Sequence, residues 1–237
     1  MRQIVHTKPN HFMAPLVMTV IAILFTIAAP DGSWSRLIGI VLMTASILLT
    51  LQAAEMVKPR RNIAAAMMII AAALSSYGTT TSTYEVRGVG NAIAALPILF
   101  AAVMVLRWIT RQARIQVNMQ AVVGGVLVYL LIGMMFGSIY GAVTDLGPAM
   151  QFFCSQPTST TSDRLYFSFS TITTTGFGDF VPCTQVGHTL AVTEAVFGQI
   201  YLVTIIALLV GSIGGRARTK SEIAADEATD ESEAQSD

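Results

Sequence analysis

Long apolar stretches separated by short polar segments dominate the hydrophobic pattern of the chain. A helix needs ~20 consecutive apolar residues to cross the ~30 Å hydrocarbon core of a bilayer. Five of the stretches reach or approach this length, whereas the third is short, ends in a Ser-Ser-Tyr segment (75–77) and precedes a Thr/Ser run (79–83) that we expect to be a loop. The pattern predicts six membrane-spanning helices, over approximately residues 13–29, 37–56, 62–77, 91–110, 119–143 and 187–214.

The composition of the 237 residues agrees with a protein of the lipid bilayer. The chain is 53% hydrophobic and 12% charged, with a mean hydropathy of +0.62, whereas a soluble domain carries ~25% charged residues. The net charge of +0 says little about partners, because the two signs lie in different segments. Basic residues occur singly or in threes at the ends of the stretches, so we expect no nucleic-acid partner.

The basic residues also predict how the chain lies in the membrane. If the N-terminus is cytoplasmic, all but three of the 14 Lys and Arg residues fall on the cytoplasmic side, as the positive-inside rule requires. The exceptions are Arg36, Arg87 and Arg164. This asymmetry needs the short third span, because without it the orientation of everything before it would reverse. We therefore expect a multi-pass protein of the plasma membrane with both termini in the cytoplasm.

A cleaved signal peptide is the alternative interpretation of residues 1–30. Arg2 and Lys8 would form its basic region, and residues 27–29 (Ile-Ala-Ala) would form its cleavage site. The apolar run of 13–29 is longer than the ~7–15 residues usual for such a signal. We expect a first membrane span here, and the sequence leaves open whether residues 1–30 are retained.

The most informative motif lies between the fifth and sixth stretches. Residues 171–179 read Thr-Ile-Thr-Thr-Thr-Gly-Phe-Gly-Asp. Gly176 and Gly178 lack a Cβ atom, so the backbone can adopt φ values that other residues avoid and can turn its carbonyls toward one axis. Carbonyl oxygens arranged in this way replace the hydration shell of an ion.

This motif resembles the selectivity-filter signature of potassium channels, Thr-Val-Gly-Tyr-Gly-Asp and its Phe variants. The resemblance implies that K⁺ ions are held by backbone carbonyls, with the Thr174 hydroxyl added at the inner end. Phe177 would point away from the ion path and wedge the loop against its surroundings, and Asp179 would anchor the outer end of the loop. The implied ion-binding residues are Thr174, Thr175, Gly176, Phe177 and Gly178.

Two positions depart from the commoner residues of that family. Thr175 stands where Val is more usual, but it is also β-branched and contributes its carbonyl, so we expect selectivity to survive. Phe177 replaces Tyr and loses one hydroxyl hydrogen bond behind the filter. This change puts the rigidity and inactivation of the filter in doubt, but not the identity of the ion.

The residues on either side of the motif extend the resemblance. Residues 163–173 predict a short re-entrant helix with Asp163 capping its N-terminus. Its C-terminus carries about half a negative charge, which favours a cation in the centre of the pore. Residues 165–169 and 194–201 look like the matching parts of bacterial two-helix pore domains. Because one chain holds one filter strand, the resemblance implies a homotetramer, in which each chain has three identical partners.

Two residues of the last stretch invite a functional interpretation. Glu194 is the only acid deep in a predicted span, and an ionisable residue there is a functional hypothesis by default. It either faces a cavity and concentrates cations or lies behind the filter, protonated or hydrogen-bonded, and we expect the second arrangement. Gly198 is either a bending point for a gate, as the resemblance implies, or a small residue that permits close helix packing.

Cys154 and Cys183 are the two cysteines of the chain, and both fall on the predicted outer side. A disulfide that braces the outer mouth is one interpretation in an oxidising compartment, and two unpaired thiols are the other. Two cysteines without nearby His residues do not predict a metal site, so K⁺ in the filter is the metal ion that we expect.

The first four spans resemble the layout of voltage-gated channels but lack its sensor. A voltage sensor needs several arginines across its fourth helix, each worth ~2.3 kcal/mol per 100 mV. Residues 91–106 carry no charge, so we expect weak or no voltage dependence. The stimulus that opens the channel is not indicated by the sequence.

Together these patterns predict an all-α integral membrane protein of three parts. Residues 1–115 form a four-span domain, residues 116–216 form the pore domain, and residues 217–237 form an acidic tail too poor in apolar side chains to fold. The expected function is passive, potassium-selective conduction across a bacterial inner membrane. No nucleophilic triad, phosphate-binding loop or metal-ligand spacing indicates an enzyme or a cofactor.

Three alternative functions remain open from the sequence. The first is a non-selective or sodium-permeable cation channel on the same scaffold. The second is the conducting subunit of a potassium transporter, although such subunits carry four degenerate filter loops in one chain and this chain carries one intact loop. The third is a non-conducting membrane subunit or sensor, against which the intact glycines speak.

Overall fold

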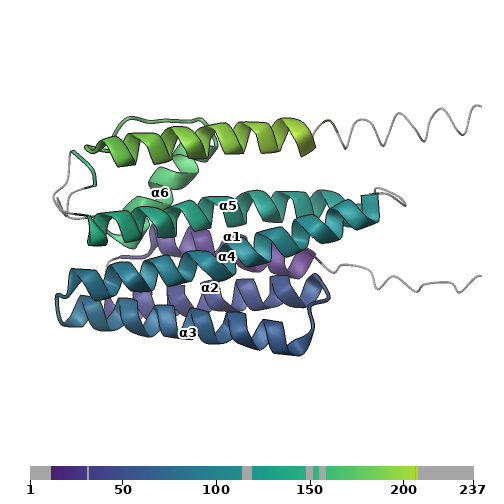
Figure 1. Ribbon diagram of the computed structural model, residues 1–237, viewed down its shortest axis with the longest axis horizontal. Coiled ribbons are helices and arrows are strands. Elements are labelled where there is room, and N and C mark those ends of the chain that lie inside the picture. The colour runs from purple at the N-terminus through teal and green to yellow at the C-terminus, as the bar shows by residue number, and fades with distance from the viewer. Residues whose placement is uncertain are drawn as a thin grey trace, which may run out of the picture.

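The computed structural model is a bundle of helices lying nearly side by side, with one short helix set obliquely between two long ones (Figure 1). It describes residues 12–30, 32–113, 119–147, 152–154, 159–205 and 207. The helices are α1 (Met13–Ala28), α2 (Ser33–Ala53), α3 (Lys58–Thr80), α4 (Tyr84–Ala113), α5 (Met119–Leu146) and α6 (Thr161–Ile172), followed by a C-terminal helix (Gln185–Ile205). The described part contains no strand beyond one isolated bridge between Phe153 and Pro182. The predicted tail (217–237) lies outside the described residues.

Among the residues that the structure describes, five helices are long and apolar enough to cross a bilayer: α2, α3, α4, α5 and the C-terminal helix. The remaining apolar helix, α1, has 16 residues. At 1.5 Å per residue it is ~24 Å long, which is less than the ~30 Å hydrocarbon core. A sixth span at α1 therefore stays a prediction.

The third helix is longer than its apolar pattern indicates. α3 has 23 residues and continues to Thr80, so the expectation of a loop over 79–83 is wrong at its first two residues. The Thr79 hydroxyl donates to the carbonyl of Ser75 (2.7 Å), and the Thr80 hydroxyl donates to that of Tyr77 (2.8 Å). These bonds satisfy the polar side chains inside the helix. The chain turns only at 81–83, and α4 begins at Tyr84, seven residues before the stretch we expected.

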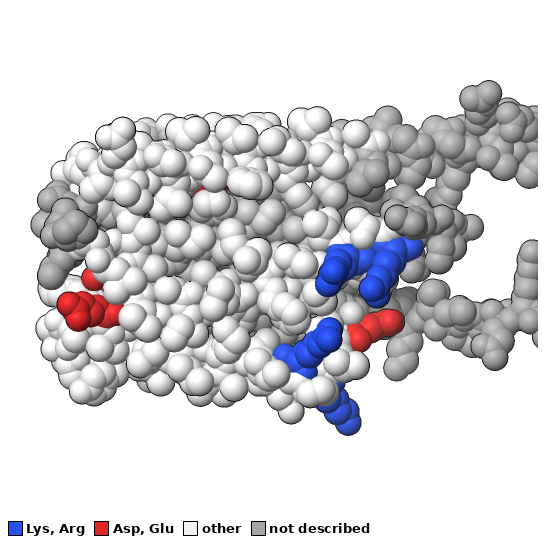
Figure 2. Space-filling view, in the orientation of Figure 1, with Lys and Arg blue, Asp and Glu red and all other residues white. Residues whose placement is uncertain are grey.

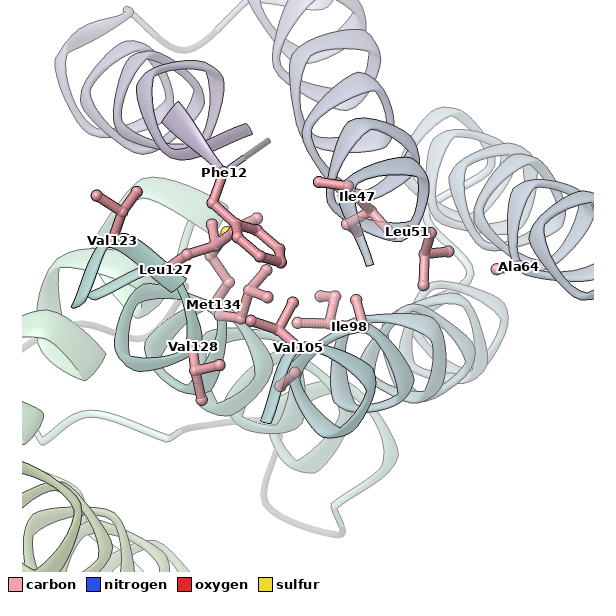
Figure 3. Close-up of a cluster of buried hydrophobic side chains, with 14 of the residues drawn as sticks. Phe12, Ile47, Leu51, Ala64, Ile98, Val105, Val123, Leu127, Val128 and Met134 are labelled. Atoms are coloured by element: carbon pink, nitrogen blue, oxygen red, sulfur yellow. The ribbon is translucent and has the colours of Figure 1, made fainter. Parts of the chain in front are cut away.

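One hydrophobic core runs through α1 to α5 and reaches Leu165 of α6 (Figure 3). It crosses residue 115, where the sequence pattern placed a domain boundary. Gly124 of α5 shows how closely the two parts pack, because a Cβ atom there would lie 3.3 Å from Ile109 and 3.4 Å from Val105 of α4. The first four helices and α5 therefore share a single core.

Basic side chains gather at one end of the bundle, where α3 begins and α4 ends (Figure 2). Phe12, just before α1, lies at this same end, because its N–H donates to Gln120 Oε1 (3.1 Å) and its ring lies 4.7 Å from that of Trp108. We call this the basic end; its described basic residues are Lys58, Arg60, Arg61, Arg107 and Arg111.

Candidate ion-conduction site

The short helix α6 begins with a capping box. Thr160 is the N-cap, and its hydroxyl accepts from the N–H of Asp163 (3.2 Å) while the Asp163 carboxylate accepts from the N–H of Thr160 (2.8 Å). The expectation that Asp163 itself caps the helix is therefore wrong, because the cap lies three residues earlier. Asp163 is the third residue of the helix and is the second partner of the capping box. The sequence carried this signal as Thr-x-x-Asp.

A row of glycines on α5 lets α6 approach it closely. A Cβ atom at Gly133 would lie 2.9 Å from the ring of Phe169, and one at Gly137 would lie 3.2 Å from Leu165 Cδ1. Gly141 continues the row four residues later. Small residues at every fourth position bring helix backbones together in membranes. The spacing is visible in the sequence, but the close contact between α5 and α6 was not predicted from it.

The C-terminal end of α6 is held between α5 and the C-terminal helix. The Tyr129 hydroxyl of α5 donates to the carbonyl of Ile172 (2.7 Å). On the other side, a Cβ atom at Gly198 would lie 2.9 Å from that carbonyl oxygen and 2.6 Å from Ile172 Cγ1. Gly198 therefore sits where the C-terminal helix touches the backbone of α6, which is the close-packing arrangement; its role as a hinge stays a prediction.

The backbone after α6 alternates between two conformations. Thr174, Gly176 and Gly178 have φ values of 58°, 56° and 81°, whereas Thr175 and Phe177 between them do not have positive φ. Such alternation turns successive peptide groups to the same side of the chain. Apart from the glycine itself and its two chain neighbours, no atom lies within 4 Å of a Cβ built at Gly176 or Gly178, so these glycines are needed for their backbone conformation and not for space. The positive φ of Thr174, a β-branched residue, was not foreseen from the sequence.

Hydrogen bonds to the end of α6 fix the direction of three carbonyls. The N–H groups of Thr174, Thr175 and Gly176 donate to carbonyls of Ser170 and Thr171, over 2.9 to 3.1 Å. In a trans peptide the C=O points opposite to the N–H, and none of the described peptide bonds is cis. The carbonyls of residues 173–175 therefore point away from α6, and Thr173 joins the residues that we expected to present them.

The outer half of the loop contacts the middle of α6 through Tyr166. The Phe177 ring stacks on that of Tyr166, with centroids 6.0 Å apart and planes inclined by 11°. Phe180 meets the same ring edge-on at 5.7 Å. The Asp179 carboxylate interacts electrostatically with the Tyr166 hydroxyl. Tyr166 thus contacts both Phe177 and Asp179, the two residues expected to wedge and anchor the loop.

Glu194 of the C-terminal helix is fully buried behind α6. Its carboxyl is hydrogen-bonded to the Tyr140 hydroxyl of α5 and to the Ser168 hydroxyl of α6. Ser168 also lies 2.7 Å from the carbonyl oxygen of Gly133. Of the two arrangements considered for Glu194, the structure has the buried, hydrogen-bonded one. Its partners were not identified from the sequence, because a hydroxyl on another helix leaves no local signal.

A disulfide joins Cys154 to Cys183, on either side of α6 and the loop. The two segments also pair through their backbones, with the N–H of Cys154 donating to Val181 (2.9 Å) and that of Cys183 to Phe152 (2.8 Å). Of the two readings of these cysteines, the structure has the bonded one. The covalent link therefore encloses α6 and residues 173–179, the candidate conduction loop.

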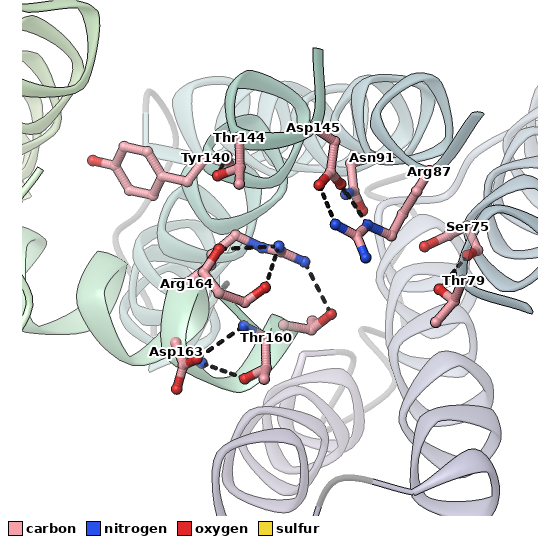
Figure 4. A network of polar contacts seen from close by, with 12 residues as sticks. Ser75, Thr79, Arg87, Asn91, Tyr140, Thr144, Asp145, Thr160, Asp163 and Arg164 are labelled. Carbon is pink, nitrogen blue, oxygen red and sulfur yellow. Dashed lines mark hydrogen bonds and ion pairs between the residues drawn. The ribbon is translucent and has the colours of Figure 1, made fainter. Parts of the chain in front are cut away.

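At the end of the bundle opposite the basic end, a polar network joins α4 to the last residues of α5 (Figure 4). Arg87 forms an ion pair with the buried Asp145, to which the Asn91 amide also donates (3.2 Å). Arg164 of α6 is buried beside this pair and donates to the carbonyl of Ser159 (3.0 Å). Asp145 was missed because it lies just beyond the apolar pattern of its helix.

Part of the chain matches a known protein family. Residues 125–213 match the model of a family described as an ion channel, and this region contains most of α5, all of α6, the loop and the C-terminal helix. The match covers less than half of the chain, and no curated protein matches the chain. With the five apolar helices, it indicates a multi-pass membrane protein that carries an ion channel domain at residues 125–213.

Proposed function

We propose that the protein is a potassium-selective channel through which K⁺ moves passively along the carbonyls of the loop after α6. The observation that carries the proposal is the direction of the backbone there: the N–H groups of Thr174, Thr175 and Gly176 turn back to α6, which directs the preceding carbonyls outward. Oxygens presented in a row can replace the hydration shell of K⁺. The Thr174 hydroxyl would add a ligand at the inner end.

The exposure of the loop supports an assembly of several chains. Residues 173–179 are all exposed in the single chain, yet non-helical backbone at membrane depth must be buried by protein or line a water-filled path. Further copies of the chain around a central axis would meet both demands. The C-terminal helix also leaves apolar side chains such as Phe197 (59% exposed) and Ile200 (60%) uncovered. We propose a homotetramer, with α6 as its re-entrant pore helix.

The charge pattern supports a particular orientation in the membrane. The basic end would face the cytoplasm, because cytoplasmic loops carry an excess of Lys and Arg. The start of α1 lies at that end beside Gln120 and Trp108, so the N-terminus would be cytoplasmic too. With α1 as a short sixth span, the C-terminus would leave on the same side. A bacterial inner membrane is the location we propose.

A non-selective cation channel on the same scaffold is the second candidate. Phe177 favours it, because this ring is 68% exposed and has no hydroxyl to bond behind the loop. Its contact with the rest of the chain is the stacking on Tyr166. A loop braced less firmly would hold its oxygens at less defined distances and would discriminate less between K⁺ and Na⁺.

Ion flux into liposomes containing the purified protein separates these functions. We expect faster K⁺ than Na⁺ uptake, with loss of uptake in Gly176→Ala, because alanine is strained at the φ of 56° found there. Gly39→Ala is the matched control, since its Cβ would meet only ordinary contacts, at 3.5 Å. Equal uptake of the two ions would contradict potassium selectivity and favour the second candidate. Absence of uptake with both ions, including after the membrane potential is varied, would contradict conduction and favour a sensor.

A further inference from the structure

A groove between α3 and α4 is a cavity that ion conduction does not use. Its volume is about 430 Å³, and its lining includes Arg60, Ile63 and Met67 of α3 and Leu96, Pro97 and Phe100 of α4. This size lies within the ~300–1,000 Å³ of sites that hold small organic molecules.

Small side chains on the floor keep the groove open. Ala64 and Pro97 are buried there, one from each helix. The walls are apolar and face outward, with Ile63 60% exposed and Leu96 54% exposed. Because α3 lies on the side of the bundle away from the C-terminal helix (Figure 1), the groove opens away from the loop that would line the pore. In the proposed assembly it would face lipid.

The polar end of the groove carries a positive charge. Arg60 lies at the basic end, where the basic side chains gather in Figure 2. Glu55, which precedes α3 in the chain, is an acid near this end, but the described basic residues outnumber it. A guanidinium binds phosphate oxygens with paired hydrogen bonds, and clustered Lys and Arg at a membrane surface attract anionic lipids.

We propose that this groove binds an anionic phospholipid, with its phosphate at Arg60 and one acyl chain along Ile63, Met67, Leu96 and Phe100. The groove matches such a lipid in both respects: its lining from α3 and α4 is apolar, and Arg60 stands at the basic end, which would lie near the headgroups in the proposed orientation. A second copy of the chain would cover the walls but would bring no phosphate to Arg60.

The test uses the purified full-length protein in phosphatidylcholine liposomes that contain a phosphatidylglycerol with a photoreactive group in its acyl chain. We expect labelling of peptides from α3 and α4 at the groove, with unlabelled phosphatidylglycerol competing and phosphatidylcholine not competing. Arg60→Gln should weaken binding roughly tenfold, the usual effect of losing a hydrogen bond to a charged group. Ile63→Trp should reduce labelling by filling the mouth of the groove from an exposed position.

Two matched variants separate a built site from a charged surface. Arg111→Gln removes a basic residue from the same end outside the groove lining, and Ile69→Trp adds the same ring at a position of α3 that is 64% exposed and also outside it. Both should bind as the wild type does. Equal losses in Arg60→Gln and Arg111→Gln would overturn the proposal in favour of diffuse attraction. So would unchanged binding in Arg60→Gln, equal competition by phosphatidylcholine, or labelling absent from the groove because another copy fills it.

Discussion

Glu194 and Ser168 are hydrogen-bonded behind the conduction loop, although the Ser168 hydroxyl also lies 2.7 Å from the carbonyl oxygen of Gly133. A hydroxyl has one hydrogen to donate, so it cannot serve both the carbonyl and an ionised carboxylate. All three groups are satisfied when Ser168 donates to Gly133 and a protonated Glu194 donates to Ser168. The second carboxyl oxygen then accepts from the Tyr140 hydroxyl.

This arrangement predicts that glutamine can replace Glu194. Its amide N–H would donate to Ser168 and its carbonyl would accept from Tyr140, so Glu194→Gln should keep the apparent Tm of the purified protein and its K⁺ flux. Glu194→Leu has a similar volume but leaves the buried Tyr140 hydroxyl without its acceptor, at a cost of about 1–3 kcal/mol, while Ser168 keeps its hydrogen bond to Gly133. Thermal unfolding in detergent measures the difference. An equal loss in both variants would show that the ionised carboxylate is needed.

Gly198→Ala should destabilise the protein because the new Cβ would meet Ile172 at 2.6 to 2.9 Å, including its backbone oxygen. Forcing an atom into packed surroundings costs about 1–3 kcal/mol, and the shift would reach the start of the conduction loop. Gly125→Ala of α5 is the control, since the new Cβ would lie 3.5 Å from Ile205 of the C-terminal helix, which is an ordinary contact. A pure hinge would behave differently: Gly198→Ala would then keep the apparent Tm and change only the fraction of time that the channel is open.

The sequence predicted features that depend on neighbours along the chain and missed those that depend on distant contacts. The glycines of the loop were recognised because a φ value is a local property, and the burial of Glu194 followed from its place in an apolar stretch. Arg87 and Asp145 are 58 residues apart, and their pairing was not predicted from the sequence. The Ser168 and Tyr140 partners of Glu194 could not be predicted for the same reason, since these contacts depend on how three helices pack.

Predictions from residue type alone also failed at two places in the chain. Thr79 and Thr80 suggested a loop by composition, but hydroxyl bonds to the preceding turn kept them helical. Asp163 suggested a cap by residue type, but Thr160 three residues earlier took that place and made the acid its partner. In both cases a polar side chain forms a hydrogen bond with a nearby backbone group. The geometry of the formed helix determines which backbone group that is.

Reduction of the disulfide should loosen the segment that holds the loop. Cys154 and Cys183 are separated by 29 residues, and closing a loop of this length stabilises a fold by about 3–4 kcal/mol in the chain-entropy description. We expect a reductant to lower the apparent Tm of the wild-type protein. Cys154→Ser should have the same low value with or without the reductant. A wild-type Tm that does not respond to reductant would contradict a structural disulfide.

The current should depend only weakly on voltage. Between Arg87 and Arg107 the helix α4 carries no charged side chain, and Arg87 is paired with Asp145, so a movement of both together transfers no net charge. Each elementary charge that crosses the membrane contributes ~2.3 kcal/mol per 100 mV, and steep gating requires several of them. Current–voltage relations of the reconstituted protein should therefore follow the K⁺ gradient without a threshold.

The variant Asp145→Asn gives a sharper comparison, because it leaves Arg87 unpaired. If α4 moves in the field, this variant should gain voltage dependence, whereas a static α4 should leave the current–voltage relation unchanged. Steep activation of the wild type over a few tens of millivolts would contradict the prediction.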